Sequence, residues 1–269
     1  MMKNLVFLYW QWLQREVAGR YRGSLLGMLW PILQPAVQIV VFTLIFYEFM
    51  HMRWPALAST SAPAENGALV YALNVFAGLA VFNFVAEILS RSPVAVLSQP
   101  NLVTKVRFPL PLLPAVTTGA ALVHVVVGTG TIAVLATATG ISPLITLPQA
   151  LLVPLILLPL LLYGLGASVL LSSLGVYVRD IGQVMPAVSS LLMFLTPIFY
   201  PLSAVPASLR NAFALNPITW GAETLRSLLL SGQWPAIDVW SGHFLVALAF
   251  AALSFFIFFR IQKGFADVL

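Results

Sequence analysis

Long apolar stretches separated by short clusters of charge form the basic pattern of this chain. More than 70 consecutive residues between Arg107 and Arg179 lack Asp, Glu, Lys and Arg, and the 25 residues between Arg22 and Glu48 are also uncharged. A helix needs about 20 apolar residues to cross the hydrocarbon core of a bilayer. The longer stretch exceeds one crossing, so we expect the chain to turn back at the Gly and Pro residues of 140–148.

The pattern predicts an all-α polytopic membrane protein. Six transmembrane helices are expected, at residues 29–49, 68–87, 110–139, 149–177, 181–200 and 239–259. Many Pro and Gly residues break the segment 201–238 into two short helices, near 206–215 and 219–230. Neither is long enough to span a bilayer, so we expect short re-entrant helices on the outer side.

The first residues follow another pattern. Between residues 4 and 22, polar side chains recur on one helical face, and Val6, Trp10 and Leu13 fall on another. Trp10 and Trp12 are amphipathic aromatics of the kind that favour the headgroup layer. We therefore expect a cytoplasmic interfacial helix that lies along the membrane surface.

These elements together predict a single membrane domain that covers residues 1–269. Its expected parts are the interfacial helix at 1–28, spans one to five at 29–200, the short outer helices at 201–238, span six at 239–259 and a cytoplasmic tail at 260–269.

Composition agrees with this architecture. The chain is 60% hydrophobic and only 8% charged, whereas about 25% charged residues are usual in a soluble domain. It has no cysteine, which excludes disulfides and thiolate metal sites. The formal net charge of +5 would suggest a nucleic-acid partner for a soluble protein, but retention of basic residues on the cytoplasmic side explains it without one.

The basic residues also predict the orientation. With six crossings and a cytoplasmic N-terminus, ten basic residues fall inside and three outside. Reversing the orientation would reverse this bias, so both termini are expected in the cytoplasm. The inside set is Lys3, Arg15, Arg20, Arg22, Arg91, Lys105, Arg107, Arg179, Arg260 and Lys263, and the outside set is Arg53, Arg210 and Arg226.

The sequence carries no motif for catalysis, nucleotide binding or metal binding. A Gly-rich phosphate loop ending in Gly-Lys-Ser/Thr is missing, and His51, His124 and His243 lie in separate segments without ligand spacing. The small residues at 164–168 do not form a serine-hydrolase motif and favour close helix packing instead. For His124 a hydrogen bond between helices is favoured over a proton relay, because a relay needs a chain of partners. The chain is therefore not expected to be an enzyme, to hold a cofactor or to bind a metal.

Several motifs, in order along nearly the whole chain, resemble the ABC type 2 exporter permeases of the polysaccharide and O-antigen class. They are Arg20-Tyr21-Arg22-Gly23-Ser24 with Leu29-Trp30 before Pro35, Asn101-Leu102-Val103 with Lys105-Val106 and Phe108-Pro109, Arg179-Asp180-Ile181, Met193 to Pro201 (MFLTPIFYP), Asn216-Pro217, Arg226, and the tail Gly264-Phe265-Ala266-Asp267.

This resemblance implies a permease subunit of the bacterial inner membrane that forms a homodimer. Two copies of a separate cytoplasmic ATPase subunit, which holds the ATP and magnesium, would drive it. The expected cargo is a lipid-linked polysaccharide, such as O-antigen on undecaprenyl diphosphate, moved to the periplasmic side. Capsule and teichoic acid exporters share the architecture, and a drug or small-lipid exporter remains an alternative. A secondary transporter is disfavoured because mid-span carboxylates are missing.

Three groups of candidate residues follow. The basic segment 90–109 suits docking on a soluble subunit, through Arg91, Asn101, Lys105 and Arg107. A cluster of arginines before the first span could meet a diphosphate headgroup, although orientation signals explain it equally well: Arg15, Arg20 and Arg22. Aromatic faces could stack on sugar rings along the conduit, the alternative being lipid-facing or core packing: Trp30, Phe42, Phe46, Tyr47, Phe194, Phe199 and Tyr200.

Overall fold

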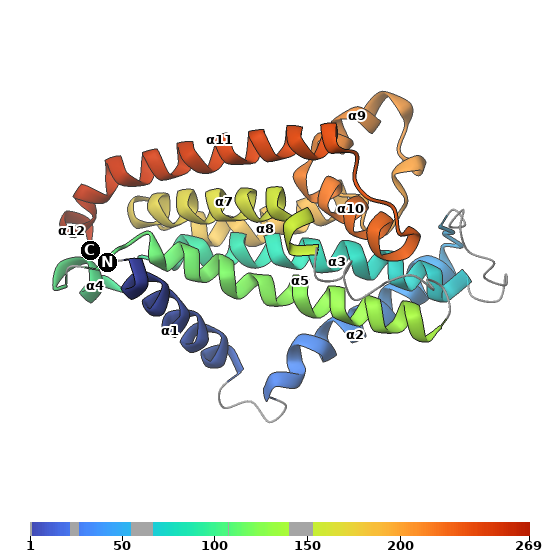
Figure 1. Cartoon of the computed structure of the whole chain (residues 1–269), viewed down its shortest axis with the longest axis horizontal. Coiled ribbons are helices and arrows are strands. Elements are labelled where there is room, and N and C mark those ends of the chain that lie inside the picture. The colour runs from blue at the N-terminus through green and yellow to red at the C-terminus, as the bar shows by residue number, and fades with distance from the viewer. Residues whose placement is uncertain (1, 22–26, 55–66, 107, 140–152) are drawn as a thin grey trace.

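Four long apolar helices form the body of the molecule. The structure, a computed structural model, describes residues 2–21, 27–54, 67–106, 108–139 and 153–269. Within these ranges the regular structure is helical, which confirms the all-α prediction for the described part of the chain. The long helices are α3 (Gly67–Arg91), α5 (Leu112–Ala138), α7 (Leu158–Tyr177) and α11 (Ile237–Ile261). They lie side by side along the long axis (Figure 1), and each is long and apolar enough to cross a membrane.

Two shorter apolar helices occupy the places expected for the first and fifth spans. The first is α2 (Trp30–Phe42), which continues without a break into the π-helical η2 (Thr43–Phe49). The second is α8 (Ile181–Leu195), with Pro186 in its interior. It ends at Leu195 rather than at residue 200, because Pro197 disfavours a helical conformation at Thr196, which is extended.

The two short helices after α8 lie at one end of the body, here called the α9 end (Figure 1). They are α9 (Ala207–Leu215) and α10 (Pro217–Ser231), close to the predicted ranges. A short 3-10 turn, η5 (Leu202–Ala204), precedes them. Asn216 caps α10 by accepting a hydrogen bond from the Ile218 amide. The two helices differ in burial, since α10 packs into the core against α3 while no residue of α9 is fully buried.

The opposite end, here called the α4 end, gathers the start of α1 (Met2–Tyr21), the connection from α3 to α5 and the residues after α11 (Figure 1). From there α1 runs obliquely along α5, and the 3-10 turn η1 (Gly27–Leu29) leads into α2. The connection from α3 to α5 forms η4 (Ser92–Val94) and α4 (Pro100–Thr104). After α11 the chain adds η6 (Gln262–Gly264) and α12 (Phe265–Val268). Both chain ends therefore lie at the α4 end.

Small residues set the spacing between the helices, as the sequence predicted for 164–168. Gly164 faces Phe84 of α3, and Gly166 faces Phe250 of α11. Ser168 is fully buried, donates to the Pro114 carbonyl at 3.0 Å and accepts from the Ser92 hydroxyl at 2.8 Å. Close helix packing is therefore what these residues provide.

Candidate functional site

A buried carboxylate joins three helices near the α4 end. Glu87 of α3 exposes only 8% of its side chain. It pairs with Arg20 of α1, with the Arg91 Nε at 3.1 Å and with the His124 Nε2 of α5 at 2.7 Å. The contact with His124 is the hydrogen bond between helices that the sequence favoured.

Arg20 of α1 supplies the positive charge that pairs with Glu87. Only 7% of the Arg20 side chain is exposed. Its Nη1 also donates to the Ala120 carbonyl of α5 at 3.3 Å. A buried charge needs a partner of opposite charge, because leaving water without one is strongly unfavourable. The Arg20–Glu87 pair therefore holds α1 against the body at this point.

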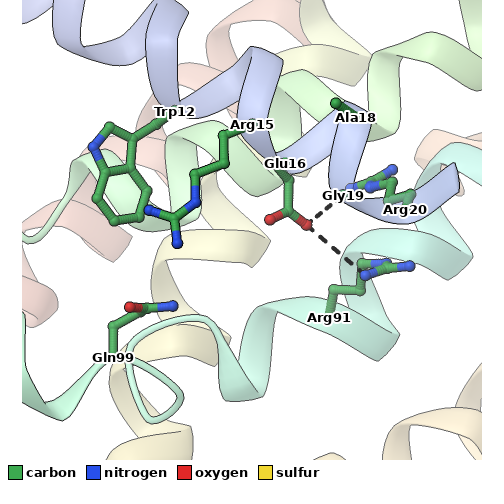
Figure 2. A pocket seen from close by; sticks show the side chains of 8 residues that line it. All are labelled: Trp12, Arg15, Glu16, Ala18, Gly19, Arg20, Arg91 and Gln99. Atoms are coloured by element: carbon green, nitrogen blue, oxygen red, sulfur yellow. Dashed lines mark ion pairs between the residues drawn. The ribbon is translucent and has the colours of Figure 1, made fainter. Parts of the chain in front are cut away.

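A second carboxylate, that of Glu16 on α1, lies nearer the surface. Glu16 reaches the Arg20 Nη2 at 3.5 Å and the Arg91 Nη1 at 3.8 Å, so it stands between the two arginines (Figure 2). One turn of helix places Glu16 and Arg20 on the same face of α1. Arg15 lies beside them, with its guanidinium 5.4 Å from the ring centre of Trp12.

These side chains surround a cavity of about 480 Å³, which we call the arginine pocket (Figure 2). Three guanidinium groups and one carboxylate line it. Arginine forks bind phosphate and carboxylate groups through paired hydrogen bonds, so the pocket suits an anionic group. Its lining residues are Trp12, Arg15, Glu16, Ala18, Gly19, Arg20, Arg91 and Gln99.

A second cavity, of about 460 Å³, adjoins the first and shares Arg20 and Arg91 with it. We call it the amide pocket, because two carboxamides help to line it. Its walls come from α1, α2, α3, α5 and α8: Arg20, Gln34, Asn83, Ala86, Glu87, Ser90, Arg91, His124, Pro186 and Ser189.

The predicted headgroup residues are partly brought together. Arg15 and Arg20 line the arginine pocket, and Arg22 lies outside the described residues. Arg91, which the sequence analysis assigned to ATPase coupling, lines both pockets. A sequence signal for this position existed, since Glu87 and Arg91 are four residues apart and so share a face of α3.

The other coupling candidates lie apart from the pockets. Asn101 and Lys105 are exposed at α4, and Arg107 lies outside the described residues. Beneath them the connection is anchored in an apolar cluster, in which Val96 packs with Phe258 of α11 and Phe265 of α12. The cluster also includes side chains of α1, α5 and α7, so the connection meets five helices there.

Four of the predicted conduit aromatics form one cluster on the α9 half of the molecule. Phe199 is buried, and its ring centre lies 4.5 Å from Phe42, 4.8 Å from Phe46 and 6.4 Å from Phe194. Of these four, Phe194 is the most exposed, at 61%.

The remaining three aromatics lie around or apart from this cluster. Tyr47 packs on Tyr71 with a centroid distance of 5.8 Å, and the Tyr200 hydroxyl donates to the Phe194 carbonyl at 2.9 Å. Trp30 stands at the first residue of α2, twelve residues before Phe42, which is about 18 Å along a helix.

Arg226 of α10 is a residue whose surroundings the sequence reasoning missed. It is almost fully buried, with 3% exposed, and donates to the Asn74 carbonyl at 2.9 Å, to Pro197 at 2.8 Å and to Ile198 at 2.9 Å. Its partner carboxylate is Glu223, at 2.7 Å. A lone arginine in an apolar short helix, three residues after a glutamate, was the available signal.

The described residues contain no group of three or more His, Cys, Asp or Glu side chains that could hold a metal ion. The polar clusters of the described chain are therefore built from arginines, single carboxylates and amides. They can bind anions and hydroxyl groups through hydrogen bonds.

Comparisons with known proteins match this chain to membrane transporters. Residues 8–230 match the family described as ABC-2 type transporter. A protein of Myxococcus xanthus named O-antigen export system permease protein RfbA is 30% identical over 207 residues, which cover 76% of this chain and 73% of the relative. A Klebsiella pneumoniae protein of the same name is 22% identical over 259 residues, covering 95% and 92%.

Proposed function

The chain belongs to the ABC-2 type transporter family, and on this premise we propose that it is the transmembrane permease subunit of an ATP-driven O-antigen exporter. Its cargo would be a polysaccharide on undecaprenyl diphosphate, moved from the cytoplasmic to the periplasmic side. The names of two relatives, both O-antigen export system permease proteins, support O-antigen as the polysaccharide. The structural observation that carries the proposal is the arginine pocket, which offers three guanidinium groups to an anionic headgroup.

In this proposal the diphosphate enters the arginine pocket. Arg15, Arg20 and Arg91 would hold its oxygens, and Glu16 would give up its place between two of them. Both of its ion pairs are long and partly exposed, so this exchange costs little. Glu87 would stay in place and keep Arg20 balanced while the headgroup is absent.

The permease would work with a partner, since the sequence contains no phosphate-binding loop for ATP. Two copies of a cytoplasmic ATPase would dock on the α4 end, through the exposed Asn101 and Lys105. Because the connection shares an apolar cluster with α1, α5, α7, α11 and α12, closure of the ATPases would move the connection together with these helix ends as one lever.

The proposed topology has six crossings of the bacterial inner membrane, with both chain ends in the cytoplasm. The four long helices would supply four of them. The other two would be α8 and the continuous α2–η2 helix, whose 20 residues from Trp30 to Phe49 reach about 30 Å. The bias of ten basic residues against three supports this orientation.

The conduit itself would form between two copies of this chain. Helices α2 and α8 present exposed apolar and aromatic side chains, among them Val40, Leu191 and Phe194, that a second copy could cover. Partly exposed aromatics such as Phe42, Phe46 and Tyr47 would offer flat faces to passing sugars. At the α9 end, α9 and α10 would close the exit between transport cycles.

The deciding experiment reconstitutes the permease with its ATPase in vesicles and adds lipid-linked O-antigen. We expect the glycan to raise ATP hydrolysis and to cross the membrane, and the permease alone to do neither. Export of a capsule polymer, a teichoic acid or a small lipid in place of O-antigen would change the proposed cargo. Uphill transport by the permease alone would contradict the dependence on a partner.

A gate at the α9 end has its own test. Leu215 is 75% exposed at the end of α9, and a Leu215→Cys variant allows two copies to be crosslinked in this cysteine-free chain. We expect crosslinked complexes to lose export and to recover it on reduction. Undiminished export by the crosslinked complex would contradict the gate.

A further inference from the structure

The amide pocket has no role in the proposal so far. Five helices contribute to its walls, and two of its residues, Arg20 and Arg91, also line the arginine pocket. Its volume of about 460 Å³ lies within the range of about 300–1,000 Å³ that small-molecule sites occupy. It can therefore hold a ligand of small-molecule size, but not a polymer.

Two carboxamides in this pocket have no hydrogen-bond partner among the residues that the structure describes. Gln34 of α2 and Asn83 of α3 make no hydrogen bond with any part of the chain that the structure describes. Each amide offers two donors and one acceptor. Polar groups within apolar helices are unfavourable unless they meet water or a polar ligand, so these amides are positioned to bind what fills the pocket.

The charged residues of the pocket are already engaged in ion pairs with one another. Glu87 pairs with Arg20, Arg91 and His124 at the pocket wall. The groups left for a ligand are neutral and hydrogen-bonding, namely the two amides and the hydroxyls of Ser90 and Ser189. Such a lining suits a neutral molecule rich in hydroxyl groups and distinguishes this cavity from the arginine pocket.

The shared arginines connect the two cavities. An anionic group held in the arginine pocket would place the groups next to it beside Arg20 and Arg91, at the edge of the amide pocket. We propose that the amide pocket binds the first sugar of the lipid-linked glycan, the one attached to the diphosphate, through Gln34 and Asn83. This inference rests on the proposed function and adds to it a site that recognises the sugar next to the diphosphate.

The test compares two lipid probes on the permease reconstituted with its ATPase. One probe is undecaprenyl diphosphate that carries a single sugar, and the other is undecaprenyl diphosphate without sugar. The double variant Gln34→Leu, Asn83→Leu keeps the side-chain size and removes the hydrogen bonds. We expect it to raise the half-maximal concentration for ATPase stimulation by the sugar-bearing probe about tenfold, because two hydrogen bonds are lost, and to leave the value for the bare lipid unchanged.

Gln183→Leu is the matched control. Gln183 lies on α8, one of the helices that contribute to the amide pocket, but it is exposed and does not line either pocket, so this variant should respond like the wild type. If the double variant does not assemble, Gln34→Leu alone serves, because Gln34 is exposed and its replacement leaves the core intact. For this single variant we expect a shift of about threefold, again only for the sugar-bearing probe.

The outcomes separate the two proposals. An unchanged response of the double variant to the sugar-bearing probe, with a normal wild-type response, overturns the sugar site and leaves the export function standing. If the double variant raises the half-maximal concentration equally for both probes, the sugar site is also overturned, since the pocket would then bind the diphosphate. A wild-type complex that responds neither to these probes nor to the full glycan contradicts the export function itself.

Discussion

The guanidinium of Arg226 lies where α3, α10 and the non-helical segment 196–199 meet. Each of its nitrogens donates to a carbonyl or carboxylate, and its carbon lies 4.5 Å from the ring centre of Trp54. Gly78 leaves room for it, since a Cβ at that position would lie 2.6 Å from the Arg226 Nη2. The arginine satisfies the carbonyls of Pro197 and Ile198, which lie outside any helix after α8, and so joins α10 to the body.

Removing this side chain should destabilise the protein strongly. We expect Arg226→Ala to lower the free energy of unfolding by about 3–5 kcal/mol, because Glu223 and the carbonyls lose their partner. Thermal unfolding in detergent measures the change. Arg210→Ala is the control, since Arg210 is exposed on α9 and makes two bonds to nearby carbonyls. If both variants lost the same free energy of unfolding, burial of Arg226 would not be the cause of the destabilisation.

The two carboxylates near Arg20 should differ in their effects. We expect Glu87→Gln to cost about 3 kcal/mol of stability, because the buried Arg20 loses its full counter-charge. Glu16→Gln should cost less than about 1 kcal/mol, because its ion pairs are long and partly exposed.

Glu16→Gln should also change binding. It removes the carboxylate that competes for Arg20 and Arg91, so we expect a roughly 2- to 5-fold lower half-maximal concentration of undecaprenyl diphosphate in the ATPase assay. A higher concentration in this variant would mean that Glu16 assists binding, contrary to the competition proposed above.

At the scale of elements, the connection between α3 and α5 is fixed against α7. Gly175 of α7 packs directly against the backbone of Pro93, where a Cβ would overlap the Pro93 carbonyl. The Ser92 hydroxyl bonds to Ser168 of the same helix. These contacts are what would allow the connection to transmit a movement rather than absorb it.

Enlarging Gly175 should separate the connection from α7. We expect Gly175→Val to lower the free energy of unfolding by about 1–3 kcal/mol or more, because the neighbour is backbone and cannot rotate away. It should also reduce the ATPase stimulation by lipid-linked glycan. Gly130→Ala on α5 is the control, since nothing lies within 4 Å of its added Cβ, and it should be neutral or slightly stabilising. Similar losses in both variants would exclude the close contact as the reason.

For the whole molecule, the decisive property is which side each end faces. The starts of α1 and α4 and the end of α12 lie together, and α9 lies at the far end (Figure 1). This arrangement agrees with an even number of crossings. The basic residues predict that the α4 end faces the cytoplasm.

Single cysteines can test this orientation, because the chain has none of its own. Ser98→Cys lies at the α4 end and Ala207→Cys at the α9 end, and both positions are exposed. We expect a membrane-impermeant maleimide to label Ala207→Cys in spheroplasts, and Ser98→Cys only after the membrane is opened. The reverse pattern would invert the topology and place the arginine pocket on the wrong side for a cytoplasmic substrate.

The sequence by itself determined the helices and their order. Continuous apolar runs predicted α5 and α11 within a few residues, and Pro and Gly marked α9 and α10 as short. These properties are local, since hydrophobicity, helix length and turn residues act within a few turns of the chain. The motifs along the chain also pointed to the family that the comparisons then matched.

Only the tertiary structure decided which polar groups meet. Arg20 and Glu87 are far apart in the sequence, and the carbonyl partners of Arg226 come from α3 and from the break after α8. The amide pocket needs side chains from five helices at once. A buried charge or amide takes its partner from whichever helix packing brings near, and no local pattern in a single sequence records that choice.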